Sequence, residues 1–487
     1  MSIHIYNTLT HSKEPFIPGE EGKVKMYVCG PTTYNYIHLG NARPLVFFDT
    51  VRRYFSYRGY QVQYVQNFTD VDDKIIKRAE EEGTDPLALA QKYIEEFFQD
   101  AQALNVKPAS VHPKVSEHIP DIVALIEQLI DKGFAYQVEG DVYFSVRSFE
   151  GYGKLSGRSL DELQAGARVE VDARKKDPLD FALWKQAKPG EPAWESPWGM
   201  GRPGWHIECS VMSLKYLGPH FDIHGGGADL VFPHHENEIA QSEAACGEPF
   251  AKYWMHNGFI TVNQEKMSKS LGNFFLVREI LAKFPADVVR FFLLETHYRS
   301  PLDFDDQKLL ESKKALDRIK NTKGLLQEKI AFLTSVNAND DYLPEESTAR
   351  KIEQCREEFI KAMDDDFNTS LALAAVFELC RVSNSFANQP DLPQKPGALG
   401  QLKRALTVLE EMVVEVLGIP LQREETARHN QDGAMVTALV ELLIELRQEA
   451  RAKKDWGTAD GIRDRLKEIG IIIEDTPHGV RWKRAEQ

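Results

Sequence analysis

A strand, a helix and a second strand near the start of the chain constrain the fold more than any other feature. Residues 25–29 (Lys-Met-Tyr-Val-Cys) are typical of a β-strand, and a Gly-Pro turn follows them. From about residue 40 to Gly59 apolar residues recur every three to four positions, which predicts a helix, and residues 61–65 predict the next strand. Two strands joined through a helix lie parallel, so the sequence predicts an α/β fold with a parallel sheet.

The rest of the chain changes character at several points, which predicts further domains. Residues 110–200 form an apparent insertion, with a helix near 121–132 and a strand at 141–146. From about residue 305 strand signals stop and helical periodicity dominates. A polar stretch at 422–433 is interpreted as a linker, and one basic, helix-rich unit follows it.

Composition and charge exclude several classes of protein. The 487 residues are 42% hydrophobic and 27% charged, which is typical of globular proteins rather than disordered or fibrous ones. No apolar run reaches the roughly 18 residues that span a bilayer, and the N-terminus has no signal-peptide pattern. Five scattered cysteines indicate a reducing compartment, so we expect a cytoplasmic protein that binds no membrane. A net charge of −15 restricts nucleic-acid contacts to local basic patches.

Two segments have features suited to binding phosphate. After the first strand, His38 and Gly40 lie where the helix begins, and free amides at a helix N-terminus attract phosphate. Gly40 lacks a side chain where a flat base could press on the backbone. Far along the chain, Lys266-Met-Ser-Lys-Ser270 can bring two cations and two hydroxyls to one polyphosphate.

Four residues distant in sequence could together hold a metal ion. Cys29 ends the first strand, and Cys209 follows a Gly-Trp-His-Ile-Glu segment. A second unit of strand, loop and helix is predicted at 220–245, and in its helix His234 and Glu238 are i and i+4 and face the same side. Two thiolates, an imidazole and a carboxylate are a plausible zinc set, although spacing alone does not prove the site.

These motifs together resemble those of the class I aminoacyl-tRNA synthetases. His38-Leu-Gly-Asn41 is similar to the family motif HIGH, with Leu39 and Asn41 as departures, and residues 266–270 match KMSKS letter for letter. Within that class the chain resembles the cysteinyl-tRNA synthetase family nearly from end to end. The likeness includes Cys-Gly-Pro-Thr at 29–32, Phe-Thr-Asp-Val-Asp-Asp-Lys-Ile at 68–75, the segments 204–210 and 224–238, and Asp-Trp-Gly-Thr-Ala-Asp at 455–460.

The resemblance implies an ATP-dependent ligase. Such an enzyme joins L-cysteine to ATP, releases pyrophosphate and transfers the cysteinyl group to the 3′ end of tRNA(Cys). One Zn²⁺ per chain, held by Cys29, Cys209, His234 and Glu238, would select the substrate thiol, and Mg²⁺ would accompany ATP. Four ligands leave open whether the substrate sulfur takes a fifth position or displaces a ligand.

The resemblance also assigns roles to individual side chains. His38, Lys266 and Lys269 would stabilise the transferring phosphates as catalytic residues. Thr69 and Trp205 would line the amino-acid pocket, and His206 and His235 would support the ligands without touching the metal. The remaining ATP-binding residues would be Gly40, Asn41, His224, Gly226, Asp229 and Ser268. The glycines at 225–227 would let the backbone approach the nucleoside, and Asp229 would bind the ribose hydroxyls.

The implied architecture is a Rossmann-like parallel-sheet catalytic domain with an insertion, followed by an α-helical bundle and a small C-terminal anticodon-binding domain. The predicted boundaries are 1–110 and 200–245 for the catalytic domain, 111–199 for the connective insertion, 246–315 for a stem-contact region with the KMSKS loop, 316–421 for the bundle and 433–487 for the anticodon-binding domain. Arg451, Trp456 and Asp460 would read the anticodon, because unpaired bases are commonly stacked on aromatic side chains. We expect a monomer.

Two other functions are compatible with parts of this pattern. A ligase that joins cysteine to an amino sugar would use the same adenylate chemistry but would need no RNA-reading unit at residues 433–487. A zinc-stabilised RNA-binding module with an inactive core would not need the lysine loop at 266–270. Transfer of labelled cysteine to tRNA distinguishes the three.

Overall fold

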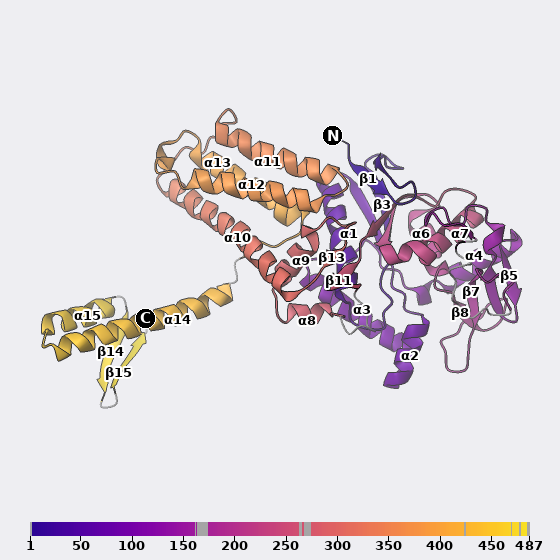
Figure 1. Ribbon diagram of the computed structural model, residues 1–487, viewed down its shortest axis with the longest axis horizontal. Coiled ribbons are helices and arrows are strands. Elements are labelled where there is room, and N and C mark those ends of the chain that lie inside the picture. The colour runs from indigo at the N-terminus through magenta and orange to yellow at the C-terminus, as the bar shows by residue number, and fades with distance from the viewer. Residues whose placement is uncertain are drawn as a thin grey trace. The chain divides into compact units, whose positions relative to one another are not determined.

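The computed structural model describes residues 2–160, 162, 174–262, 265–266, 274–422, 425–468, 470–476 and 479–484 (Figure 1). The chain divides into two compact units, Met1–Leu421 and Gln422–Gln487. Within the described residues, no helix is both long and apolar enough to cross a bilayer.

A parallel sheet of four strands organises the first unit. Its order is β10-β9-β3-β4, and every neighbouring pair is parallel. This arrangement confirms the predicted α/β fold. The strands are β3 (Lys23–Val28), β4 (Gln61–Gln66), β9 (Phe221–Gly227) and β10 (Ala251–Asn257).

The two faces of this sheet are covered by two different hydrophobic cores. Along β3, Val24, Met26 and Val28 belong to one core and Tyr27 belongs to the other, since successive side chains of a strand point to opposite faces. The first core includes α1 (Leu39–Tyr57), and the second includes α6 (Ile207–Leu217) and α7 (Glu236–Cys246). Helices on both faces explain why these strands are almost continuously buried.

The insertion packs into the second core. Its helix α4 spans Ile119–Asp131, and its antiparallel sheet has the order β5-β6-β7-β8. These strands are Ala135–Val138, Asp141–Phe144, Phe181–Gln186 and Gly201–Pro203. Two helices, α2 (Asp73–Glu82) and α3 (Pro86–Ala103), connect β4 to it.

The helical bundle packs into the first core, so it shares that core with the parallel sheet. It comprises α10 (Asp306–Ser335), α11 (Ser347–Asp364), α12 (Thr369–Ala387) and α13 (Ala398–Glu410), which continues into a π-helical segment at Glu411–Val416. Figure 1 shows these helices beside one another. The remaining elements of the unit are β1 (His4–Asn7), β2 (Ser12–Pro15), β11 (Ile260–Val262), β12 (Glu265–Lys266), α8 (Val277–Leu281), α9 (Ala286–Glu295) and β13 (Leu302–Asp303).

A buried ionic cluster joins α1 to α9 beneath the sheet. Asp49 accepts hydrogen bonds from Arg53 Nε at 2.7 Å and from Arg290 Nη2 at 2.7 Å. Burial by itself would raise the pKa of Asp49, but Arg290, Arg53 and Arg52 outweigh it and lower this pKa to about 2. Arg290 also donates to the carbonyl oxygen of Leu417, so the same cluster fixes the end of the bundle.

The second unit contains α14 (Glu425–Ala452), α15 (Trp456–Glu468) and a hairpin of β14 (Ile471–Thr476) with β15 (Gly479–Arg484). Two expectations were wrong here. Most of the predicted linker at 422–433 is helical, since α14 begins at Glu425. The hairpin was not expected either, because the prediction that strand signals stop at residue 305 overlooked the β-branched run at Ile471–Ile473.

Candidate active site and metal centre

A cavity of about 390 Å³ opens where the strands of the parallel sheet end. Cys29 follows β3, while Gln66, Gly227 and Asn257 end β4, β9 and β10. This is the usual location of ligand sites in open α/β sheets. Nine of the predicted site residues line the cavity: Cys29, His38, Gly40, Asn41, Thr69, Trp205, Cys209, Asp229 and His234.

The four predicted metal ligands lie together. One donor atom from each of Cys29, Cys209, His234 and Glu238 can be chosen so that all four atoms lie within 4.8 Å of one another. The two sulfurs are 3.8 Å apart, Cys29 Sγ is 3.5 Å from Glu238 Oε1, and His234 Nε2 is 3.0 Å from the same oxygen. The fold achieves this because Cys29 follows β3 while the other three residues lie on or beside α6 and α7, which cover the adjacent face.

The two separations that involve sulfur fit a tetrahedral zinc ion, whereas the 3.0 Å between His234 Nε2 and Glu238 Oε1 is the distance of a direct hydrogen bond. Zn–S bonds of about 2.3 Å place two tetrahedral sulfurs about 3.8 Å apart, and Zn–O bonds of about 2.1 Å place sulfur and oxygen about 3.6 Å apart. The observed distances of 3.8 and 3.5 Å agree with both values. Thiol, imidazole and carboxylate donors are also the types that Zn²⁺ prefers. The residues present therefore fit the ion.

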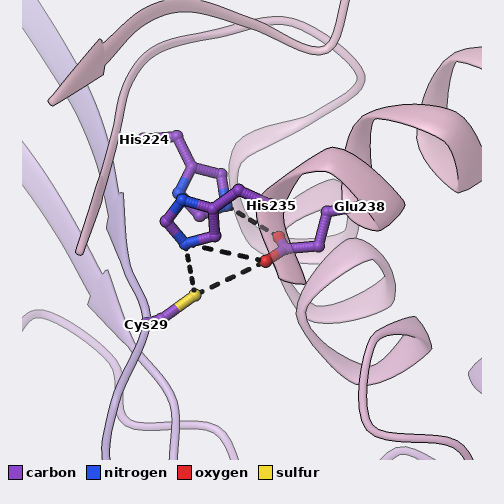
Figure 2. A group of neighbouring side chains, drawn as sticks. All are labelled: Cys29, His224, His235 and Glu238. Atoms are coloured by element: carbon purple, nitrogen blue, oxygen red, sulfur yellow. Dashed lines mark hydrogen bonds and ion pairs between the residues drawn. The ribbon is translucent and has the colours of Figure 1, made fainter. Parts of the chain in front are cut away.

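A second, overlapping cluster shares two of these residues. Figure 2 shows Cys29 and Glu238 together with His224 and His235. His224 Nε2 lies 2.7 Å from Glu238 Oε2, and His235 Nε2 lies 3.3 Å from Cys29 Sγ. The other ring nitrogen of His235 lies 2.8 Å from His256 Nε2. His224 and His235 are thus placed as supports that can orient Glu238 and Cys29.

The histidine chosen from sequence, His234, also has a supporting partner. Its Nδ1 lies 2.9 Å from His206 Nδ1, which leaves Nε2 directed at Glu238. The ring of Trp205 covers it, with ring centroids 4.6 Å apart. Of the three candidate histidines His224, His234 and His235, it is His234 that lines the cavity.

Burial and mutual contact shift the pKa values of the four candidate ligands strongly. Burial would raise the pKa of Cys209, but hydrogen bonds from Cys29 and His234 lower it to about 6. Burial would lower the pKa of His234, but Glu238 and Cys209 raise it to about 10. Burial opposes ionisation of Glu238 as well, yet His224 and His234 keep its pKa well below the usual value, while burial and Cys209 raise the pKa of Cys29. The two anionic groups, Cys209 and Glu238, are thus balanced in part by a protonated His234, whose proton a bound cation would replace.

The helix that follows β3 presents the phosphate-binding candidates. His38 is the N-cap of α1, and its backbone N–H donates to Asn41 Oδ1 at 3.2 Å. Asn41 thereby completes a capping interaction, which gives its departure from the HIGH motif a structural role. His38 also packs edge-on against Phe274, with ring centroids 4.7 Å apart.

The amino-acid candidates lie between these two groups. Thr69 is buried, and its Oγ1 donates to Glu208 Oε2 at 2.9 Å. Trp205 is 40% exposed and covers His234 from the cavity side. Trp205 thus contacts the metal cluster through His234, whereas Thr69 contacts Glu208, the residue that precedes Cys209.

Several predicted ATP-binding residues lie elsewhere. His224 is fully buried and contacts Glu238, so it lies with the metal candidates rather than on the cavity wall. A side chain on Gly226 would meet the His235 ring at 2.9 Å, which explains that glycine through packing. Only the backbone of Lys266 is described, within β12. Ser268 and Lys269 lie outside the described residues.

The sequence analysis missed three polar residues of this region. Asn257 and Glu208 are buried beside the cavity, and Arg43 is 1% exposed within α1. Arg43 donates to the carbonyl oxygens of Gly258 at 2.8 Å and Ser300 at 2.6 Å, which ties α1 to the chain that follows β10. A charged residue among the apolar positions of a predicted helix was a usable signal for Arg43. Asn257 could have been found only by predicting where β10 ends.

The anticodon candidates lie in the second unit. Trp456 is the first residue of α15 and is 57% exposed, and Asp460 is one turn further along the same helix. Asp460 Oδ1 is paired with Arg463 Nη1 at 3.0 Å. Arg451 lies in the last turn of α14. An exposed tryptophan beside polar groups is suited to stacking on an unpaired base.

Comparison with known proteins gives the same family for the whole chain. Residues 15–314 match the family described as "tRNA synthetases class I (C) catalytic domain", residues 358–422 match the DALR domain, and residues 434–482 match the "Cysteinyl-tRNA ligase anticodon binding domain". These matches support neither the amino-sugar ligase nor the inactive RNA-binding module.

Curated relatives match along nearly their full length. The cysteine–tRNA ligases of Desulforamulus reducens and Carboxydothermus hydrogenoformans are each 64% identical, with 99% of this chain and 100% of the relative covered. That of Anoxybacillus flavithermus is 53% identical with the same coverage.

Solved structures with low identity share the fold. A Mycobacterium tuberculosis methionyl-tRNA synthetase in complex with methionyl-adenylate has a TM-score of 0.62 at 15% identity, and the alignment covers 81% of this chain and 92% of that one. The leucyl-tRNA synthetase of Agrobacterium radiobacter has a TM-score of 0.60 at 13% identity, covering 83% and 85%. The family matches, the full-length relatives and the shared fold together show that this chain belongs to the cysteine–tRNA ligase family of class I aminoacyl-tRNA synthetases.

Proposed function

We propose that the chain activates L-cysteine with ATP and then transfers the cysteinyl group to the 3′ end of tRNA(Cys). One observation carries this proposal. Three of the four clustered metal-ligand candidates line the same cavity as His38 and Asp229. A site that selects the thiol and a site that binds the nucleotide would therefore lie in one cavity. The family membership of the chain supports the same reaction.

Selection of cysteine over serine would rest on the metal cluster. A conventional pocket separates such near-isosteres by only about 1–3 kcal/mol. One Zn²⁺ bound by Cys29, Cys209, His234 and Glu238 would supply a soft Lewis acid that favours a thiol over an alcohol. Trp205 would close the pocket over His234 and exclude water from the sulfur. The Thr69 hydroxyl donates its hydrogen bond to Glu208, so its oxygen remains able to accept a hydrogen bond from the substrate ammonium group.

Adenylate formation would then depend on positioning and on charge stabilisation. A carboxylate oxygen of cysteine attacks the α-phosphorus of ATP, and the bond to the bridging oxygen breaks as pyrophosphate leaves. His38 and the first amides of α1 would meet the phosphates, with Gly40 and Asn41 shaping the helix start. Lys266, Ser268 and Lys269 would stabilise the charge on the leaving pyrophosphate. Mg²⁺ would accompany the nucleotide as its counter-ion.

Recognition of tRNA(Cys) would involve the second unit. Trp456 offers an exposed face for stacking, and Arg451 and Asp460 offer hydrogen-bonding groups for anticodon bases. The match of residues 434–482 to an anticodon-binding family supports this role for the second unit. We further propose a cytoplasmic, monomeric enzyme, since all five cysteines are free and tRNA charging supplies ribosomes.

The test combines metal analysis with two activities. The purified protein should contain one zinc per chain, catalyse cysteine-dependent exchange of pyrophosphate into ATP, and transfer labelled cysteine to tRNA. Cys209→Ser should lose zinc and cysteine activation, while Cys246→Ser, which changes an exposed cysteine outside the cluster, should match wild type. Label that reaches an amino sugar but never tRNA would contradict the proposed acceptor.

A further inference from the structure

Asn257 combines deep burial with a side-chain amide that has no partner. The residue is 1% exposed, and within the described part of the chain neither Oδ1 nor Nδ2 has a hydrogen-bond partner. It also lines the cavity. An amide buried without partners is costly, so its persistence at the edge of an active site points to a ligand that satisfies it.

The register of the sheet places this amide beside Asp229. Asn257 ends β10 and pairs in parallel with Gly227, which ends β9 one strand spacing of about 4.8 Å away. The carboxylate of Asp229 lies close to Gly227, since a Cβ atom on Gly227 would meet Asp229 Oδ1 at 2.4 Å. Both Asp229 and Asn257 line the cavity, so an acceptor-only carboxylate and a donor-and-acceptor amide reach it from adjacent strands.

We infer that Asn257 hydrogen-bonds a ribose hydroxyl of ATP and that Asp229 and Asn257 together hold the 2′,3′-diol. This inference rests on the proposed ATP-dependent function. A hydroxyl that gives its proton to Asp229 presents an oxygen that can accept from Asn257 Nδ2, and the neighbouring hydroxyl can donate to Oδ1. The two side chains are therefore complementary to a pair of vicinal hydroxyls.

The base of the nucleotide fits this corner less well than the sugar. The ring nitrogens on a purine edge are acceptors that the carboxylate of Asp229 would repel, and only the single amino group of adenine could donate to it. Hydroxyl groups can instead donate to the carboxylate and still accept from the amide. The charge of Asp229, one strand away, thus favours ribose as the partner of Asn257.

The test measures cysteine-dependent pyrophosphate exchange with ATP, 2′-deoxy-ATP and 3′-deoxy-ATP. Asn257→Leu keeps the approximate shape of the side chain and removes both polar atoms, and Asn257→Ala truncates it. Both variants should raise KM for ATP about tenfold, with KM for cysteine and zinc content within twofold of wild type. With either deoxy analogue, the tenfold difference between the variants and the wild type should become smaller, because one of the two hydroxyls that Asn257 would bind is already gone.

Stability provides a readout that a purely structural role would not give. Asn257→Leu replaces two unsatisfied buried atoms with apolar ones, so its Tm without ligand should equal or exceed that of wild type. Asn384→Leu is the matched control, since Asn384 lies on α12 in the bundle and also has a buried side-chain oxygen without a partner among the described residues. Its kinetics with all three nucleotides should match those of wild type.

Three results would overturn the inference. They are an unchanged KM for ATP in both variants, a rise in KM that stays tenfold with both deoxy analogues, and a rise in KM for cysteine instead of ATP. Cysteine-dependent exchange by the wild type tests the proposed function separately, so a failure of the Asn257 variants to behave as expected is distinguishable from a failure of that function.

Discussion

Replacing His224 separates its two possible roles, support of the metal centre and direct contact with ATP. Its Nε2 lies 2.7 Å from Glu238 Oε2, and both side chains are fully buried. A buried hydrogen bond to a charged group contributes about 1.5–3 kcal/mol, which corresponds to roughly 10- to 150-fold in affinity. Since Glu238 is a candidate ligand, His224→Gln should weaken zinc binding by about 10- to 100-fold, the usual effect of losing such a support.

The assay is competition for zinc between the protein and a chromophoric chelator, followed by pyrophosphate exchange at saturating zinc. We expect the exchange activity to recover largely when zinc is added, with KM for ATP close to that of wild type. His118→Gln is the matched control, because His118 is buried and hydrogen-bonded through both ring nitrogens but belongs to neither metal cluster. Unaltered zinc affinity together with a raised KM for ATP would refute this reasoning and favour the role in ATP binding predicted from sequence.

Three further predictions follow from the structure. Asp49→Asn leaves Arg53 and Arg290 buried without a counter-charge, so chemical denaturation should show a loss of about 3–5 kcal/mol, and a loss below about 1 kcal/mol would contradict the cluster's importance. Folding lowers the pKa of Asp49 from 3.8 to about 2, so the ionised carboxylate contributes about 2 kcal/mol to the free energy of unfolding above pH 4. This contribution should be lost as the pH falls toward 2, and denaturant titrations of the wild type and the Asn variant at several pH values check it. Trp456→Ala removes a stacking surface worth about 1–3 kcal/mol, so kcat/KM for tRNA charging should fall roughly 5- to 150-fold while pyrophosphate exchange is unchanged, and equal effects on both activities would argue against anticodon contact.

The sequence predicted the sheet well, because its strands and helices depend on local patterns that the fold preserves. The strand at 25–29 and the helix after residue 40 follow from periodicity, and the structure has them at Lys23–Val28 and Leu39–Tyr57. The i and i+4 relation of His234 and Glu238 is likewise local. Their proximity to Cys29 is not local, and it was predicted through family resemblance rather than physics.

Other features depend on contacts that no local pattern encodes. The pairing of β10 with β9 brings Asn257 opposite Gly227, and neither residue marks this pairing in the sequence. The same holds for His224, which looked like part of a nucleotide-binding segment because glycines follow it. In the folded chain Gly225 makes room for the ring of Phe48 and Gly226 makes room for His235, so these glycines serve packing between the sheet and its flanking layers.

The connection between β3 and α1 explains how one fold can join thiol selection to nucleotide chemistry. Cys29 and His38 are separated by eight residues, and both line the cavity. Cys29 belongs to the metal cluster, whereas His38 is the N-cap of α1, the helix whose first amides are candidates for binding phosphate. A substrate cysteine held by its sulfur at the metal cluster would therefore lie in the same cavity as His38. We expect that lengthening this connection by one residue would leave zinc content intact but slow adenylate formation, and rapid-quench measurement of a single turnover would detect the difference; an unchanged rate would show that the two sites are positioned independently.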